Sequence, residues 1–196
     1  VGEILGYSFV YVSDSKEFAF LDYLAISKFS QNQGYGIKMI ALLLERFKEY
    51  KYGLICETPF PNEGQIDYYA KFVERTHGYF CDFRYHYPSN EERVPARLTI
   101  YPHAHVKFIE KEAIQRIVKE SNIFIHNDVA NVNRVAESNA RYIKDFEIVE
   151  ENIQITINKA QSQIYNVEPK YNFVYRFFPE KNQRHFDYGF SITSRL

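Results

Sequence analysis

The sequence predicts an α+β fold, an α/β arrangement around a mixed sheet, and three observations support this class. Short β-prone runs, of which ILGYSFVYV at 4–12 is the clearest, are interspersed with amphipathic runs such as IKMIALLLERFKEY at 37–50. A stretch with two glycines, SQNQGYGIK at 30–38, connects the second strand-like run to the first helical one. Hydrophobic residues make up 45% of the 196 residues, which is enough to build a core.

The first half of the chain is predicted to run strand, strand, helix, strand, helix, strand, strand. The turn Ser13–Lys16 separates two runs that read as an antiparallel hairpin. The helical runs repeat apolar residues at helical spacing, and the pair His77-Gly78 ends the second of them. The predicted strands are 4–12, 18–26, 52–58, 79–87 and 94–101, and the predicted helices are 37–50 and about 65–76.

The second half reads as helices followed by an antiparallel meander. Apolar residues at helical spacing predict helices over 106–120 and 128–144. Alternating or aromatic-rich runs then predict strands at 152–157, 162–167, 171–178 and 185–193, with 179–183 as the loop of the last hairpin. We expect two parts, residues 1–105 and residues 106–196, the second of unknown role.

The balance of charge argues against nucleic acid and membrane partners. Lys plus Arg number 24 and Asp plus Glu 25, so no overall field attracts the chain to polyanions or anionic lipid. No apolar run approaches the roughly 20 residues that span a bilayer, and no signal peptide is recognised. Cys56 and Cys81 lack a CxxC spacing, which suits buried thiols in the cytoplasm. Because the chain opens on Val1 in strand-like sequence, we expect a missing N-terminal segment.

The glycine-bearing stretch is a candidate anion site. Gln31-x-x-Gly34-x-Gly36 lies between a strand and the first turn of a helix, where backbone N–H groups lack intrahelical acceptors and the helix dipole favours an anion. We expect Gly34 and Gly36 to let the backbone approach a pyrophosphate closely and to adopt conformations that a side chain would forbid. The spacing differs from both a nucleotide P-loop and a dinucleotide fingerprint. The alternative is a tight strand-to-helix connection with no ligand.

At these residues the sequence resembles the GNAT superfamily of N-acetyltransferases, over roughly residues 2–101. The family's signature is Gln/Arg-x-x-Gly-x-Gly/Ala, with an aliphatic residue five positions earlier, where Ile26 stands here. The resemblance implies a GNAT fold that lacks its usual N-terminal elements, acetyl-CoA as cosubstrate, and an amine acceptor. The cofactor-binding residues that it implies are Leu24, Ala25, Ile26, Gln31, Asn32, Gln33, Gly34, Tyr35, Gly36 and Ile37.

The resemblance also implies catalytic residues. Glu57 ends the strand that resembles the family's fifth, where a partly desolvated carboxylate could deprotonate the acceptor ammonium. Asp22 is an alternative base, and a solvated carboxylate is the alternative role for Glu57. The family's general-acid Tyr has no direct counterpart, because Phe72-Val73 stands about there. Tyr69, one turn earlier, is the substitute that we name, although packing would also explain Tyr69 and its neighbour Tyr68.

Two further patterns have structural explanations. His103-x-His105 could begin a metal site, but no third ligand is evident, and we predict no metal. The aromatic residues of 171–190 could form a base-stacking platform, but without an excess of basic residues they read as a hydrophobic sheet face or a subunit interface. We expect the second half either to pack on the first beside the acceptor cleft or to form a homodimer interface.

Two functions therefore remain open. The first is an acetyl-CoA-dependent N-acetyltransferase with direct attack by the amine on the thioester. The second is a catalytically degenerate GNAT-fold module that binds CoA or a protein partner.

Overall fold

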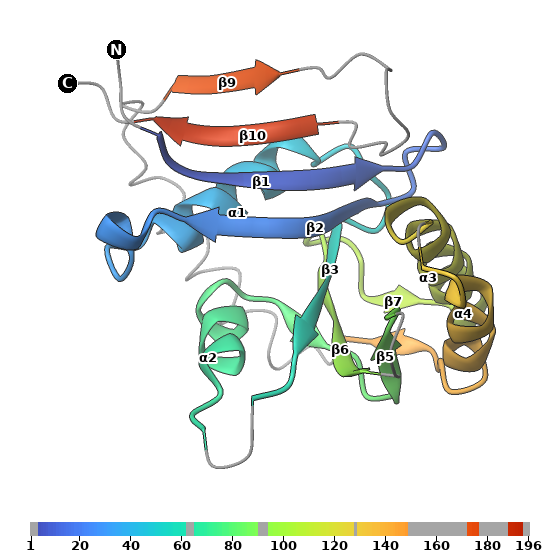
Figure 1. The fold of residues 1–196 in the computed structure, drawn as a ribbon. Helices are drawn as coiled ribbons and strands as arrows, with labels where there is room; N and C mark the ends of the chain where they lie inside the picture. Colours follow the sequence, from blue (N-terminus) through green and yellow to red (C-terminus); the bar gives the residue numbers. More distant parts are fainter. Residues whose placement is uncertain are drawn as a thin grey trace.

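The computed structural model describes residues 4–61, 65–89, 94–127, 129–148, 172–176 and 188–193, the last two segments as strand backbone only. One large mixed sheet dominates the fold, with strand order β4-β6-β3-β2-β1-β10-β9 and with β5 also paired to β6 (Figure 1). β2 and β3 are parallel, and the other pairs are antiparallel. The predicted fold class, a mixed α/β arrangement, is confirmed.

Most predicted strands are confirmed with small changes in their bounds. The predicted strand at 79–87 is two short strands separated by residues 81–84, both paired with β6. The strands of the large sheet are β1 (Ile4–Val12), β2 (Ala19–Ile26), β3 (Leu54–Pro59), β4 (Tyr79–Phe80), β5 (Tyr85–Tyr87), β6 (Val94–Tyr101), β9 (Asn172–Arg176) and β10 (Tyr188–Thr193).

In the part of the chain that the structure describes, the predicted helices are confirmed in their order, but their ends are shifted. α1 begins two residues earlier than predicted, because Gly34 is its N-cap, and α3 begins five residues later, because the short strand β7 precedes it. The bounds are η1 (Lys28–Ser30), α1 (Tyr35–Arg46), α2 (Tyr68–Arg75), α3 (Lys111–Ile125) and α4 (Val132–Ala140), and the small pair of strands is β7 (Phe108–Ile109) with β8 (Phe146–Glu147).

The C-terminal strands do not form a separate meander. β10 pairs with β1 from Ile4↔Thr193 to Val10↔Tyr188, and β9 pairs with β10. β10 and β9 therefore extend the large sheet beyond β1 (Figure 1). The strands predicted at 152–157 and 162–167 and the hairpin loop at 179–183 lie outside the described residues.

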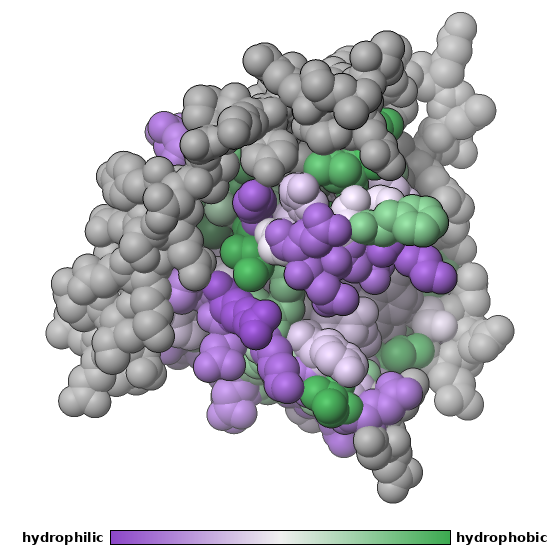
Figure 2. Space-filling view, turned by 90° about the vertical axis from the view of Figure 1, so that its left-hand side faces the viewer, coloured by the Kyte–Doolittle hydropathy of each residue, from purple (hydrophilic) through white to green (hydrophobic). Residues whose placement is uncertain are grey.

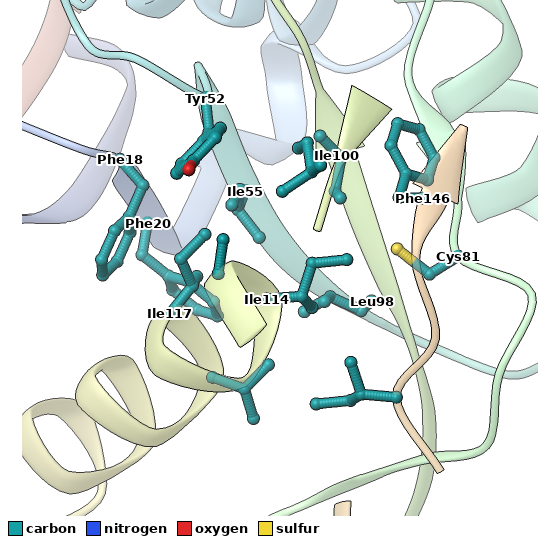
Figure 3. Packing of buried hydrophobic residues seen from close by; sticks show 14 of the residues in the cluster. Phe18, Phe20, Tyr52, Ile55, Cys81, Leu98, Ile100, Ile114, Ile117 and Phe146 are labelled. Atoms are coloured by element: carbon teal, nitrogen blue, oxygen red, sulfur yellow. The ribbon is translucent and has the colours of Figure 1, made fainter. Parts of the chain in front are cut away.

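Two hydrophobic cores lie on the two sides of the sheet. One contains Leu21, Leu54 and Cys56 of the strands and is covered by Met39, Ile40 and Leu43 of α1. The other contains Phe18, Phe20 and Ile55 and is covered by Ile114 and Ile117 of α3 (Figure 3). The alternation of side chains along β2 and β3 explains this division.

Residues 106–148 therefore pack on the strands of the first half. The shared core joins side chains of β1, β2, β3 and β6 to side chains of α3 and of the segment around β8. The part of our expectation that placed this segment on the first half is confirmed for the described residues. The division at residue 105 stays a prediction.

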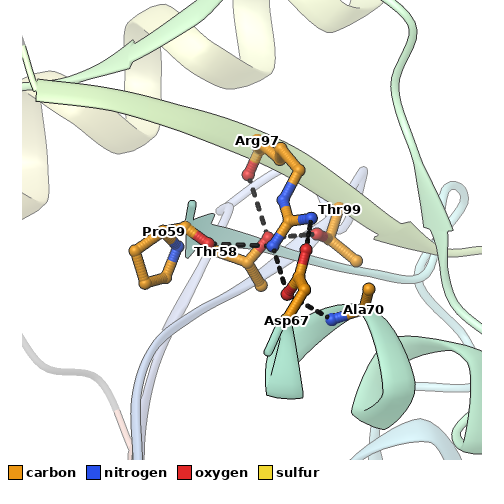
Figure 4. Close-up of polar contacts among 6 residues, drawn as sticks. All are labelled: Thr58, Pro59, Asp67, Ala70, Arg97 and Thr99. Carbon is orange, nitrogen blue, oxygen red and sulfur yellow. Dashed lines mark hydrogen bonds and ion pairs between the residues drawn. The ribbon is translucent and has the colours of Figure 1, made fainter. Parts of the chain in front are cut away.

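Arg97 and Asp67 fasten the beginning of α2 to β6 (Figure 4). Asp67 is the N-cap of α2 and accepts from the Ala70 N–H at 2.8 Å. The Arg97 guanidinium donates to both carboxylate oxygens of Asp67 and, at 2.9 Å, to the Pro59 carbonyl. It also stacks on the Phe80 ring, with 4.2 Å from Cζ to the ring centroid. This contact positions α2 relative to the ends of β3 and β6.

Acid is expected to weaken this contact. Hydrogen bonds from Arg97 lower the pKa of Asp67 below its ordinary value of 3.8. A carboxylate whose pKa is lower in the folded state than in the unfolded state stabilises the fold at pH values above 3.8. This stabilisation is lost as the pH falls through the folded-state pKa. Asp67→Asn keeps a capping oxygen but no charge, so its deficit in unfolding free energy relative to the wild type should shrink from pH 7 to pH 3.

The matched variant Asp67→Ala removes the cap as well. Its deficit at pH 7 should be about 1 kcal/mol larger than that of Asp67→Asn. Urea denaturation followed by circular dichroism at both pH values measures both differences. An Asp67→Asn deficit that does not change with pH would contradict a charge-dependent contact.

Among the described residues, none of the helices combines the length and the apolar character that crossing a membrane requires.

Candidate functional site

A cleft of about 1090 Å³ opens where β2 and β3 separate. The two strands are paired only at Ala19–Leu54, Phe20–Ile55 and Leu21–Cys56. The next residue, Asp22, is the extra residue of a bulge, because the register with β1 shifts between Phe9↔Tyr23 and Val10↔Leu21. A bulge bends its strand, so β2 leaves β3 at this point (Figure 1). From Asp22 onward, the edge of β2 faces the cleft without pairing to β3.

Most of the predicted cofactor residues belong to the wall of this cleft. Leu24, Ile26, Gln31, Asn32, Gly34, Tyr35, Gly36 and Ile37 line it, together with α2. Ala25 lies between Leu24 and Ile26 on β2, and the side-chain amide of Gln33 donates to the Phe29 carbonyl at 3.0 Å. Figure 2 shows this side of the molecule, where hydrophilic residues of the near surface surround recessed hydrophobic ones.

The glycine-bearing turn has the geometry of an open cradle. Gly34 has φ +81, a left-handed conformation that side chains disfavour, and no described atom lies within 4 Å of where its Cβ would be. Gln31 donates from Nε2 to the Ile26 carbonyl at 3.2 Å, which ties the two ends of the motif together. The first-turn N–H groups of α1 thus begin beside open space at the cleft.

The two glycines have different roles. Gly36 lies inside the first turn of α1, and a Cβ there would be 3.0 Å from Cε2 of Phe72. Its lack of a side chain lets α2 pack against α1. The expectation that both glycines adopt conformations forbidden to other residues is therefore wrong for Gly36, because only Gly34 has a positive φ.

Glu57 also lines the cleft, on β3 one residue beyond the last pair with β2. Its side chain is 9% exposed, yet it lines the cleft. The Tyr85 hydroxyl of β5 donates to Oε1, and His126 of α3 approaches Oε2 with its Nε2 at 3.6 Å. A mostly buried carboxylate is thus held between two elements and keeps access to the cleft.

Tyr85 is a fixed donor to this carboxylate. Its side chain is 1% exposed, and burial, followed by the neighbouring Glu57 charge, raises its pKa well above the ordinary value. The hydroxyl therefore stays protonated. It also lies 3.2 Å from Oδ1 of the fully buried Asn122. Because a hydroxyl has one proton, Tyr85 can donate either to Glu57 or to Asn122, and the charged acceptor is favoured.

Asp22 belongs to the same electrostatic group. Burial raises its pKa, His126 opposes that rise and Glu57 adds to it. The structure thus brings together the two carboxylates that the sequence offered as alternative bases. Glu57 is the better placed of the two, since its carboxylate has a defined hydrogen-bond donor.

The tyrosines of α2 lie on the side of the cleft that faces solvent. Tyr69 and Tyr68 line the cleft and are 47% and 71% exposed. Phe72 also lines the cleft, whereas Val73 is buried and is not part of the wall. Lys71 and Arg75 add two cationic side chains to the wall formed by α2. The cleft is therefore basic along α2 and acidic at Asp22 and Glu57.

Sequence reasoning missed Tyr85, Asn122 and His126. One signal was available: Asn122 falls four residues after Val118 on the apolar face of α3, and both are buried. A polar residue on a buried helix face needs a partner, which here lies on another strand.

The other candidates behave as structural residues. Nε2 of His103 donates to the Phe47 carbonyl at 3.0 Å, and its ring stacks on His105. In the described part of the chain, no three His, Cys, Asp or Glu side chains are grouped as metal ligands would be. Both cysteines are buried, and burial raises the pKa of Cys56 to about 12, so its thiol is not a ready nucleophile.

Residues 2–73 match the sequence model of the acetyltransferase (GNAT) family. None of the curated proteins compared with the chain matches it.

Among the solved structures that resemble the chain are three acetyltransferases. The first, described as a GNAT-family acetyltransferase from Bacteroides thetaiotaomicron, is 18% identical, with a TM-score of 0.46 over 62% of this chain and 65% of that one. The ribosomal-protein-S18-alanine N-acetyltransferase of Escherichia coli is 20% identical, with a TM-score of 0.39 over 50% and 61%. A Bacillus subtilis acetyltransferase in complex with CoA is 12% identical, with a TM-score of 0.38 over 50% and 69%. The chain thus spans less than two thirds of the first two structures.

Proposed function

From the match of residues 2–73 to the acetyltransferase (GNAT) family, we propose that the chain transfers an acetyl group from acetyl-CoA to an amine. The observation that carries the proposal is the cleft itself. It joins an open helix N-terminus at Gly34 to a mostly buried carboxylate at Glu57. The acceptor class that we propose is a primary amine in its protonated form.

The cofactor part of the cleft suits two parts of CoA, the pyrophosphate and the pantetheine arm. The N–H groups of the first turn of α1 would hold the pyrophosphate, with Lys71 and Arg75 as nearby cations. The unpaired edge of β2 from Leu24 to Ile26 would take the pantetheine arm by strand-like hydrogen bonds. Gln31, Asn32, Gln33, Tyr35, Gly36 and Ile37 complete this proposed site.

The acidic end suits the acceptor. Acetyl-CoA, when bound, supplies an activated thioester carbonyl. We propose that Glu57 takes a proton from the acceptor ammonium, and that main-chain N–H groups of β2 polarise the thioester carbonyl. The amine nitrogen then bonds to the carbonyl carbon, and the C–S bond breaks. Tyr69 would protonate the departing thiolate from the wall of the cleft.

Binding of acetyl-CoA tests the first half of the proposal. Calorimetric titration should detect binding to the wild type, and Gly34→Asp should weaken it by about 100-fold or more. The substitution places a carboxylate where the phosphates are proposed to lie, and like charges in contact cost several kcal/mol.

Gly34→Asn is the matched control. Asn has almost the same shape as Asp and tolerates φ > 0, and the space around Gly34 is open. It should retain most of the affinity. Equal losses in the two variants would show that shape and not charge matters there. Absence of binding to the folded wild type would reject the function.

The alternative is a degenerate module that binds CoA without turnover, and Phe72-Val73 in place of the family's Phe-Tyr is the observation that favours it. Thiol release from acetyl-CoA across a panel of primary amines, peptides and aminoglycosides discriminates between them. CoA binding without thiol release from any acceptor would support the module.

A further inference from the structure

His126 lies directly behind Glu57 as seen from the cleft. It is the C-cap of α3, its side chain is 8% exposed, and Glu57 and Tyr87 line the cleft whereas His126 is not part of the wall. Within the described chain, Nε2 of His126 has no hydrogen-bond partner, and the group that it approaches is Oε2 of Glu57 at 3.6 Å. A buried ring nitrogen without a partner is costly, so its orientation calls for an explanation.

The other carboxylate oxygen is already held. Tyr85 donates to Oε1, and Asn122, one turn before His126 on α3, lies beside the Tyr85 hydroxyl. A second hydrogen-bond donor to the Glu57 carboxylate would therefore act on Oε2. The His126 ring is kept edge-on to Tyr87, with centroids 4.7 Å apart at 73°, which fixes its direction.

We propose that His126 is a positioning residue for the base, donating Nε2–H to Oε2 of Glu57 while Tyr85 donates to Oε1. This inference rests on the proposed transferase function. The separation of 3.6 Å would shorten once acceptor is bound, as catalytic hydrogen bonds often do. Two donors from behind fix the plane of the carboxylate, and each oxygen retains a lone pair for the acceptor ammonium.

The proton balance is simple. Glu57 gains one proton from the ammonium, whose N–H bond breaks, and the freed amine forms the N–C bond while the C–S bond breaks. Tyr69 gives its proton to the departing thiolate, and the second proton that the nitrogen loses as the amide forms restores the Tyr69 hydroxyl. His126 and Tyr85 keep their own protons throughout. The titratable groups that face His126 are Asp22 of β2, Glu57 of β3 and Tyr87 of β5, and Tyr85 of β5 is on the other oxygen of Glu57.

The proposal gives α3 a role in the site. His126 and Asn122 lie far outside residues 2–73, the segment that matches the family. The second half of the chain would then help to position the base, Glu57, in addition to covering the core.

The first test is nuclear magnetic resonance of the full chain without ligands, with ¹⁵N-labelled histidine. The chain has six histidines, and His126→Gln identifies the signals of His126. The wild type should show a downfield Nε2–H proton on His126 that is protected from exchange. Glu57→Gln should move this proton upfield or abolish it.

Glu120→Gln is the matched control. Glu120 is on the same helix and likewise accepts from a tyrosine hydroxyl, that of Tyr11 at 2.7 Å. This variant should leave the His126 proton unchanged. A His126 ring without a proton on Nε2, or one that does not respond to Glu57→Gln, overturns the proposal.

The second test is kinetic, with acetyl-CoA and the panel of primary amines. His126→Leu should lower kcat by about 10–100-fold, the worth of one hydrogen bond to a charged group, and shift the pH profile of kcat/KM. His126→Gln, which keeps an N–H donor, should recover most of the rate, and KM for acetyl-CoA should stay unchanged. Equal rates and pH profiles in the wild type and His126→Leu overturn the role.

The two tests distinguish a failure of this inference from a failure of the proposed transferase function. A missing Nε2–H contact rejects this inference whether or not the protein transfers acetyl groups. A contact that is present in a chain that releases no thiol with any acceptor rejects the transferase function, and with it the catalytic role of His126.

Discussion

Replacing Glu57 with Gln should lower the rate of amine acetylation by about 10²–10⁴-fold, the usual contribution of a general base. Gln has the shape of Glu and can still accept from Tyr85, so the packing of this mostly buried side chain should survive. It cannot accept a proton from an ammonium. Thiol release at saturating acetyl-CoA measures the loss, and calorimetry should show unchanged affinity for acetyl-CoA, since Glu57 is not among the proposed cofactor-binding residues.

Glu74→Gln is the control for this prediction. Glu74 is exposed on α2, so the same chemical change should leave the rate unaltered there. An active enzyme whose rate is insensitive to Glu57→Gln would move the role of base to Asp22, the other carboxylate at the acidic end.

Truncating Ile117 to Ala should destabilise the whole protein by about 2–5 kcal/mol. The side chain is 1% exposed and packs in the core that includes Phe18, Phe20 and Ile55 (Figure 3). If 106–148 and the sheet unfold together, a cavity on α3 lowers the stability of both. Chemical denaturation followed by circular dichroism is the measurement, since the chain has no Trp.

Lys119→Ala provides the comparison on the same helix. Lys119 is exposed, and its truncation should change the unfolding free energy by no more than about 0.5 kcal/mol. Two separate unfolding transitions, with Ile117→Ala affecting one of them alone, would contradict a shared core and support two independent domains. A single transition shifted by the predicted amount would favour one cooperative unit.

Local sequence was sufficient for most of the elements. β1 and β6 have the predicted bounds, and the helices occur in the predicted order, because apolar periodicity and turn residues act over a few positions. The turn at Gly34 was also readable, since the need for φ > 0 belongs to a single residue. The bounds that failed, such as the start of α3, depended on the short β7–β8 pair, which joins residues far apart in the sequence.

The sequence by itself determined the fold class, the glycine-bearing helix start and Glu57 as a candidate base, because these depend on residue type and near neighbours. Only the tertiary structure decided that β2 and β3 separate at Asp22, that Gly36 makes room for Phe72, and that β10 joins β1. It alone brought Tyr85, Asn122 and His126 to Glu57. Glu57 and His126 are 69 positions apart, and their meeting depends on how α3 packs on the sheet, which no local pattern encodes.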